Sequence, residues 1–256
     1  MSRGPLIDYG RMLELLQAEA RLLVAAAQGA PPDSPTVGVS GRTLGETVRY
    51  AGDLCEDVLS WLGASEEAAR RWTVPNDPTI GQLTSRFALR LAELLEQLRV
   101  RSPEDPCPSW CPVDRTVRFW ARHVLHSTTV QRVDVQTAAG VEISPIDEDA
   151  ALDGIDETLR VWFGHRLNAL GIVPSKKCSV AVSSGGRNWL VTTGPEVAVV
   201  DGSDVEAPAA ADAVVTGVPQ RVCLWLRGRL PNHAVSTGGD PDAVAQLWGL
   251  LQVCTK

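Results

Sequence analysis

Three polar side chains recur at every fourth residue of the segment DRTVRFWARHVLHSTTVQRVDVQTAAG, namely His123, Ser127 and Gln131. In a helix, residues four apart lie on one face, so these side chains would form a single stripe. An imidazole transfers protons near neutral pH, and a hydroxyl and a carboxamide orient ligands through hydrogen bonds. Together with Tyr50 of an earlier segment, Ser127 and Gln131 form a polar trio that we expect inside an apolar bundle, where the three side chains either bond to one another and plug the site or orient an organic ligand.

A second polar set lies in TLGETVRYAGDLCEDVLSWL, where Glu46 precedes Tyr50 by about one helical turn. The Tyr50 hydroxyl is a candidate hydrogen-bond donor or general acid, with His123 or His126 as the base. Glu46 also has a simpler explanation, because Thr43 and Glu46 form a T-x-x-E capping box at a helix start. For His126, packing or one hydrogen bond is a sufficient explanation.

Four amphipathic helices must position these residues. Apolar residues with helical period predict helices over about 7–27, 43–62, 79–98 and 114–140. Four helices of about 20 residues suit an up-and-down bundle. The composition changes at VEISPIDED, which we interpret as a linker between one domain at 1–142 and another at 148–256.

The second half of the chain predicts a small α+β domain. ALDGIDETLRVWFGHRLNALG predicts a fifth helix, and two more helices are expected around VPQRVCLWLRGRL and DPDAVAQLWGLLQVC. Four short β-branched stretches separated by turn residues predict strands: CSVAVSS, NWLVTTG, VAVVDG and DAVVTG. The SSGGRN segment predicts a hairpin turn between two of them. The fold class is therefore α+β, with a helical bundle first.

The bulk composition limits the partners. A net charge of −7 argues against a nucleic-acid backbone as the main partner. No apolar run approaches the length of a membrane span, and the N-terminus does not resemble a secretory signal, so a cytoplasmic monomer or small homo-oligomer is expected. The six scattered cysteines are interpreted as ordinary buried or loop thiols.

Nearly the whole chain resembles the mycothiol-dependent maleylpyruvate isomerase family. The segment FWARHVLHSTTVQRVDVQ is close to that family's FWARRMAHETAVHRVDAQ, and TLGETVRYAGDLCEDVLSWL resembles its metal-binding helix. The segments PIDEDAALDGIDETL, NWLVTTGP and LWLRGRLP resemble its C-terminal domain. The resemblance implies a damage-inducible-B-like (DinB-like) four-helix bundle followed by a sterol-carrier-like α+β domain.

The resemblance also implies a divalent metal, usually zinc, which is held by two histidines and a glutamate and activates the thiol of mycothiol. In this sequence the three ligand positions carry Tyr50, Ser127 and Gln131. A phenol, a hydroxyl and a carboxamide are poor zinc ligands at neutral pH, so no metal is expected there. No cofactor is expected, although binding of mycothiol stays open.

Further candidates are less specific. A relocated metal site would combine His123 with Glu46 and Asp53, but capping and solvation explain both carboxylates more simply. In the family an arginine of the second domain fits an anionic substrate, which implies Arg229 or Arg227 here; both also suit a helix C-terminus at the surface. Packing explains the tryptophans, although Trp120 is a candidate ligand contact.

Three functions remain open at this point. The first is a metal-independent small-molecule enzyme of isomerase, addition or cyclisation type that uses a pocket between the domains. The second is a non-catalytic protein that binds a ligand or regulates a partner. The third is a metal- and thiol-dependent isomerase or transferase with a rearranged site. The expected ligand is a small organic molecule, and an anionic one is an option that the two arginines leave open.

Overall fold

The computed structural model describes residues 6–37, 41–63, 78–194, 198–201 and 211–255. The chain divides into two compact units, one at residues 7–144 and the other at 145–256 with residues 1–6. Leu6 belongs to the second unit, where its N–H donates to Asp153 Oδ1 at 2.6 Å.

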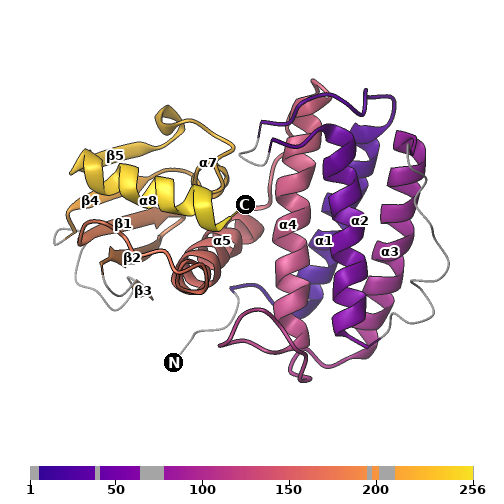
Figure 1. Cartoon of the computed structure of the whole chain (residues 1–256), viewed down its shortest axis with the longest axis horizontal. Helices are drawn as coiled ribbons and strands as arrows, with labels where there is room; N and C mark the ends of the chain where they lie inside the picture. Colours follow the sequence, from indigo (N-terminus) through magenta and orange to yellow (C-terminus); the bar gives the residue numbers. More distant parts are fainter. Residues whose placement is uncertain (1–5, 38–40, 64–77, 195–197, 202–210, 256) are drawn as a thin grey trace. The chain divides into compact units, whose positions relative to one another are not determined.

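The first unit is a bundle of four helices, as the sequence predicted (Figure 1). The helices are α1 (Tyr9–Ala27), α2 (Leu44–Trp61), α3 (Ile80–Val100) and α4 (Val117–Ala138). Each begins where a side-chain oxygen of Asp8, Thr43, Thr79 or Thr116 accepts a backbone N–H. The predicted Thr43 capping box is confirmed. The fourth helix begins three residues later than predicted, because Thr116 caps it.

Helices α2 and α3 run in the same direction. Near their middles, Arg86 Nη1 donates to Asp53 Oδ1 at 2.6 Å. At their C-terminal ends, Arg101 Nη2 donates to the carbonyl of Leu62 at 2.9 Å. In an up-and-down bundle, consecutive helices run in alternating directions. The pair α2 and α3 departs from this rule.

The bundle core consists mainly of leucines and valines, with Met12, Phe87 and Phe119 among the larger buried side chains. Helix α1 packs mainly on α4, and α3 packs mainly on α2. Leu16, Leu23, Phe87 and Leu94 are fully buried between them. Helix α4 is buried around most of its circumference, so its polar residues must find partners or remain unsatisfied inside the protein.

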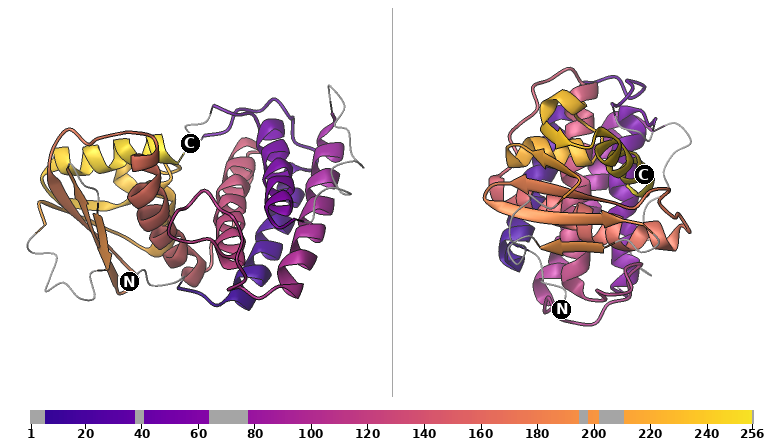
Figure 2. Two further views of the ribbon diagram at one scale, coloured as in Figure 1. Left: turned by 60° about the horizontal axis from the view of Figure 1, so that its bottom comes forward. Right: turned by 90° about the vertical axis from the view of Figure 1, so that its left-hand side faces the viewer.

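The second unit is a five-stranded mixed sheet with helices packed against one of its faces (Figure 2). The strands are β1 (Cys178–Ser184), β2 (Arg187–Thr193), β3 (Ala198–Asp201), β4 (Ala213–Thr216) and β5 (Ser236–Gly239), in the order β3-β2-β1-β4-β5. Only β1 and β4 pair in parallel. The predicted hairpin between β1 and β2 is confirmed, with Gly185 and Gly186 at positive φ.

Helices α5 (Glu148–Glu157), α6 (Leu167–Ala169), α7 (Pro219–Leu226) and α8 (Pro241–Cys254) accompany the sheet, together with a short 3₁₀ turn, η5 (Asn232–Ala234). The predicted fifth helix is present, but its central part is a π-helix, η2 (Thr158–Arg166). Strand β5 was not predicted, because its Ser-Thr-Gly-Gly sequence is exposed and lacks apolar alternation.

In the parts of the chain that the structure describes, every helix is too short or too polar to cross a membrane.

Candidate functional site

The candidate residues of the first unit lie on α2 and α4. Helix α2 carries Glu46 and Tyr50, and α4 carries His123, Ser127 and Gln131. The three residues of α4 share one face, as their spacing predicted. No hydrogen bond joins Tyr50, Ser127 and Gln131 within the described part of the chain, so the structure does not show the mutual bonding that would plug the site.

Gln131 is the least satisfied of these residues. Its side chain is 5% exposed, and its Oε1 has no hydrogen-bond partner among the described residues. Ser127, one turn earlier on the same face, is half-buried. A buried acceptor without a partner is rare in folded proteins and marks either an energetic cost or a place where a ligand or water binds.

Tyr50 is exposed rather than buried in the core. Its side chain is 37% exposed, and the guanidinium carbon of Arg42 lies 4.0 Å from the centre of its ring. This cation–π contact holds the ring while leaving the residue open to solvent. The expectation of a tyrosine inside an apolar bundle is therefore wrong, because Arg42 covers its ring from outside α2.

His123 lies in an aromatic cluster. Its ring stacks on Phe119 at 5.8 Å and meets Trp110 and Trp120 edge to face at 5.6 and 5.9 Å. Trp120 donates its indole N–H to the Pro108 carbonyl at 2.8 Å, so its own polar atom is engaged. These contacts fix the imidazole plane, and Trp120 acts mainly as packing for it.

The carboxylates of the relocated metal site are both engaged elsewhere. Glu46 accepts the backbone N–H of Thr43 at 2.8 Å in the capping box. Asp53 pairs with Arg86 at 2.6 Å, so it is an ion-pair partner and not only a solvated charge. His126 is buried at 4% exposure.

The zinc ion of the maleylpyruvate isomerase family does not fit the donors present at this position. Tyr50, Ser127 and Gln131 offer neutral oxygens, and Arg42 adds a positive charge beside the phenol. Zinc sites use thiolate, imidazole and carboxylate ligands, which bind zinc more strongly than neutral hydroxyl or carboxamide oxygens. Among the residues that the structure describes, no three His, Cys, Asp or Glu side chains are grouped as a metal site.

A second polar cluster on α4 was missed by the sequence reasoning. Arg132 is fully buried, and its Nε donates to Glu19 Oε2 of α1 at 2.7 Å. Its Nη1 donates to Gln136 Oε1 at 2.9 Å and to the Ser144 carbonyl at 2.7 Å. The sequence contains one indication of this network. Glu19 is a charged residue within the apolar stripe of α1, and a buried carboxylate needs a partner.

The two candidate arginines of the second unit differ in their contacts. Arg227 is buried, donates to Glu157 Oε2 at 2.5 Å and to Thr158 Oγ1 at 2.7 Å, and lies over the ring of Trp162. The surface position expected for Arg227 is therefore wrong, because a carboxylate of its own domain compensates its charge. Arg229 is half-buried and donates to the Arg227 carbonyl. Its role in binding an anion stays a prediction.

All six cysteines are free and buried, which agrees with their interpretation as ordinary thiols. Burial raises the pKa of Cys55 and of Cys254 to about 12, and it also raises the pKa of Cys107. A thiol with a raised pKa is a poor nucleophile at neutral pH, so these three thiols do not supply covalent chemistry.

Comparisons with known proteins do not assign the chain to a family. No protein-family model matches it, and no curated protein matches it. Among solved structures, one similar chain is the stereoselective inverting sec-alkylsulfatase Pisa1 from Pseudomonas sp., with 11% sequence identity and a TM-score of 0.26. The match covers 78% of this chain but only 32% of the sulfatase, so the chain spans about a third of that protein's length. At this TM-score the likeness supports no conclusion about fold or function.

Proposed function

We propose that the protein is a metal-independent small-molecule enzyme whose substrate binds at the middle of α4, where the resemblance would place a metal. The observation that supports this is the buried, unpartnered carbonyl oxygen of Gln131. An unpaired buried acceptor costs about 1–3 kcal/mol, and a ligand that donates a hydrogen bond removes this cost. The lack of mutual bonds between Gln131, Ser127 and Tyr50 supports a ligand at this position more than a closed plug.

The ligand would be a small organic molecule with a hydroxyl, amine or amide donor for Gln131. The Ser127 hydroxyl can donate or accept a hydrogen bond one turn away. The reaction would be an isomerisation, addition or cyclisation, in which an acid donates one proton to the substrate and a base removes one from the substrate or from the group that adds to it. Tyr50 is the candidate acid, and His123 or His126 is the candidate base.

A second candidate function is non-catalytic ligand binding. The observation that favours it is the set of ring contacts that hold both candidate acid–base groups. The His123 ring lies among Phe119, Trp110 and Trp120, and the Tyr50 ring lies under Arg42. Such packing restricts the reorientation that a proton-transfer group often needs. A binding protein would keep Gln131 and Ser127 as ligand contacts without using the other two residues in chemistry.

The test begins with the ligand. Full-length protein, purified without metal-affinity steps, is extracted and analysed by mass spectrometry for retained small molecules. It is then screened for thermal stabilisation by mycothiol and by a panel of hydroxy acids and amides. Gln131→Leu should abolish the stabilisation. Gln252→Leu is the matched control, because Gln252 is also buried with unpartnered amide atoms but belongs to the other unit.

The same experiment separates the two candidate functions. If the proposal is correct, the wild type converts the stabilising compound, and Tyr50→Phe lowers turnover while binding remains. A ligand that stabilises the protein but is recovered unchanged assigns the second function. Stabilisation that survives Gln131→Leu contradicts both candidates. Metal analysis of the same sample should give less than about a tenth of an equivalent of zinc, given the tight binding of a working zinc site.

A further inference from the structure

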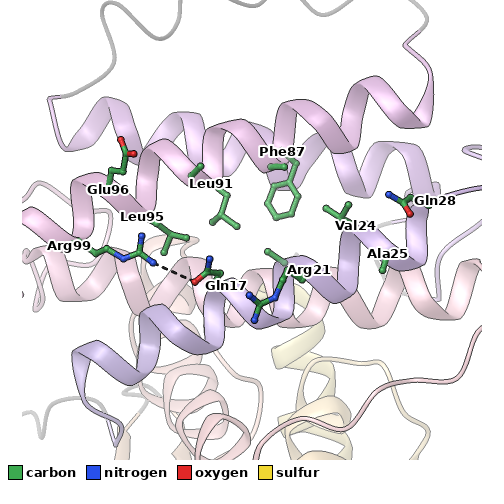
Figure 3. Close-up of a pocket in the computed structure, with 13 residues that line it drawn as sticks. Gln17, Arg21, Val24, Ala25, Gln28, Phe87, Leu91, Leu95, Glu96 and Arg99 are labelled. Atoms are coloured by element: carbon green, nitrogen blue, oxygen red, sulfur yellow. Dashed lines mark hydrogen bonds between the residues drawn. The ribbon is translucent and has the colours of Figure 1, made fainter.

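A groove of about 490 Å³ runs between α1 and α3, and its lining includes none of the candidate site residues discussed above (Figure 3). The two helices run in opposite directions. The Tyr9 hydroxyl, at the start of α1, donates to the Leu98 carbonyl near the end of α3. The volume lies within the range of about 300–1,000 Å³ that is typical of small-molecule sites.

The floor of the groove is apolar and its walls are low. Phe87, Leu91 and Leu95 of α3 and Ala20 of α1 form the floor, and each is at most 5% exposed. The walls consist of small side chains, which leave space between the helices: Val24, Ala25, Ala88 and Ala92. The result is a narrow apolar channel along the bundle rather than a broad apolar surface.

The opening of this channel carries positive charge. Gln17 and Arg21 lie four residues apart on one face of α1, and Arg99 Nη2 of α3 reaches Gln17 Oε1 at 3.5 Å. Neither Arg21 nor Arg99 has an ion-pair partner within the described residues. In Figure 3 the Glu96 carboxylate points away from the Arg99–Gln17 pair. The two guanidinium groups are therefore available to an incoming anion.

We propose that this groove binds an amphipathic anion, with its hydrocarbon chain on the floor and its carboxylate between Arg21 and Arg99. A guanidinium matches a carboxylate in geometry and charge, and both arginines are exposed where such a head group would lie. The chain would replace water over the exposed methyl groups of Val24, Ala25, Ala88 and Ala92, which is favourable in proportion to the apolar area covered. This proposal is independent of the function proposed for Gln131.

The shape of the groove favours a slim ligand over a protein partner. The apolar surface that the groove leaves accessible is a strip formed by Val24, Ala25, Ala88 and Ala92, which suits one hydrocarbon chain but offers little apolar contact to a docking helix or a second copy. A stable protein interface usually buries about 1,200 Å² or more, and the exposed residues around this groove are mostly alanine, glutamine and charged residues.

The proposal is tested by calorimetry on the full chain with three probes of equal chain length: decanoate, decanol and decyltrimethylammonium. Decanoate should bind most tightly and the cation most weakly. Shorter carboxylates should lose about fourfold in affinity for each methylene removed. Arg21→Gln and Arg99→Gln should each weaken decanoate binding about tenfold and leave decanol unaffected. Arg11→Gln, on the same helix but outside the groove, is the control.

Ala92→Trp should fill the groove and abolish binding of all probes, whereas Leu89→Trp, at an exposed position of α3 outside the lining, should not. Circular dichroism verifies that both variants fold. If Ala92→Trp does not fold, the arginine variants still test the proposal.

Equal binding of the three probes, or decanoate binding that survives the double arginine variant, overturns the proposal. A dimer in sedimentation that Ala92→Trp dissociates would also overturn it by assigning the groove to a second copy. Gln131→Leu should leave decanoate binding unchanged.

Discussion

Two buried glutamines on the same helix have opposite surroundings. Gln131 and Gln136 of α4 are 5% and 4% exposed. Gln136 Oε1 accepts from Arg132 Nη1 at 2.9 Å and from the Ser144 N–H at 3.1 Å, and its Nε2 donates to Ser144 Oγ at 2.9 Å. The Gln131 carbonyl has no partner among the described residues. Residue type and burial are therefore equal, and only the partners differ.

The comparison distinguishes buried polar groups that stabilise the fold through hydrogen bonds from buried polar groups that lack such bonds. A buried carboxamide with partners on both atoms holds α4 to the segment that follows it. A buried carboxamide without a partner for its oxygen destabilises the protein unless a ligand or water compensates. Substitutions at the two positions should therefore have opposite consequences.

The largest effect is expected at Arg132, the centre of the satisfied cluster. Arg132→Met should lower the free energy of unfolding by about 3–5 kcal/mol, because it leaves the Glu19 carboxylate buried without its partner. The double variant Glu19→Leu/Arg132→Met should recover much of that loss, since it removes both charges. Urea denaturation followed by circular dichroism measures both values. A double variant as unstable as the single one would contradict this account.

The direct comparison is between Gln136→Leu and Gln131→Leu. The first should cost about 1–3 kcal/mol, since it strips partners from Arg132 and from Ser144. The second should change stability by at most about 0.5 kcal/mol, or raise it, because only an unpaired acceptor is removed. Equal losses at the two positions would mean that Gln131 has a structural partner after all.

Tyr9 is another polar residue with a hydrogen-bond partner. Its substitution should have a smaller effect on stability than those at Arg132 and Gln136. Tyr9→Phe should cost about 1 kcal/mol, the usual value of one hydrogen bond, because the Leu98 carbonyl loses its donor. Burial raises the pKa of Tyr9 to about 12, above the value of about 10 in unfolded chains. The unfolded state therefore loses its proton first, and wild-type stability should fall between pH 10 and pH 12.

The Tyr9→Phe variant should lack this contribution to the alkaline loss of stability. Unfolding curves recorded from pH 8 to pH 12 for both proteins measure the difference. Parallel curves for the two proteins would contradict the assignment to Tyr9.

The smallest effect is expected at Glu46, which was considered both as a cap and as a site residue. Glutamine also fits the third position of a capping box, so Glu46→Gln should change stability by only a few tenths of a kcal/mol, consistent with a retained cap. If Glu46 contacted a ligand, the same variant would weaken binding in the thermal-shift assay that uses Gln131→Leu. An unchanged ligand response would confine Glu46 to capping.

Local patterns in the sequence predicted much of the fold. The capping box at Thr43 and the alternating strands follow from short-range rules, and the structure has them. The parallel direction of α2 and α3 could not be predicted, because it depends on pairing between distant residues. The π-helix at 158–166 depends in the same way on packing that local propensity does not encode.

The candidate site was less predictable than the fold. Periodicity placed His123, Ser127 and Gln131 on one face, but it gave no information about which of them would find partners. The position of Tyr50 under Arg42 depends on where the preceding loop returns to α2. The groove between α1 and α3 arises from alanines on two helices far apart in sequence, which are individually unremarkable helix residues.

The packing of α1 on α4 also has a consequence for how the protein folds. The Glu19–Arg132 pair joins residues 113 positions apart, and this contact lies between the first and last helices of the bundle. Contacts of such long range close large loops before they contribute stability, and they slow folding relative to bundles with neighbouring contacts. During synthesis α1 lacks its main packing partner until α4 has emerged, although it can already contact α3. We therefore expect the bundle to form late and as one cooperative unit.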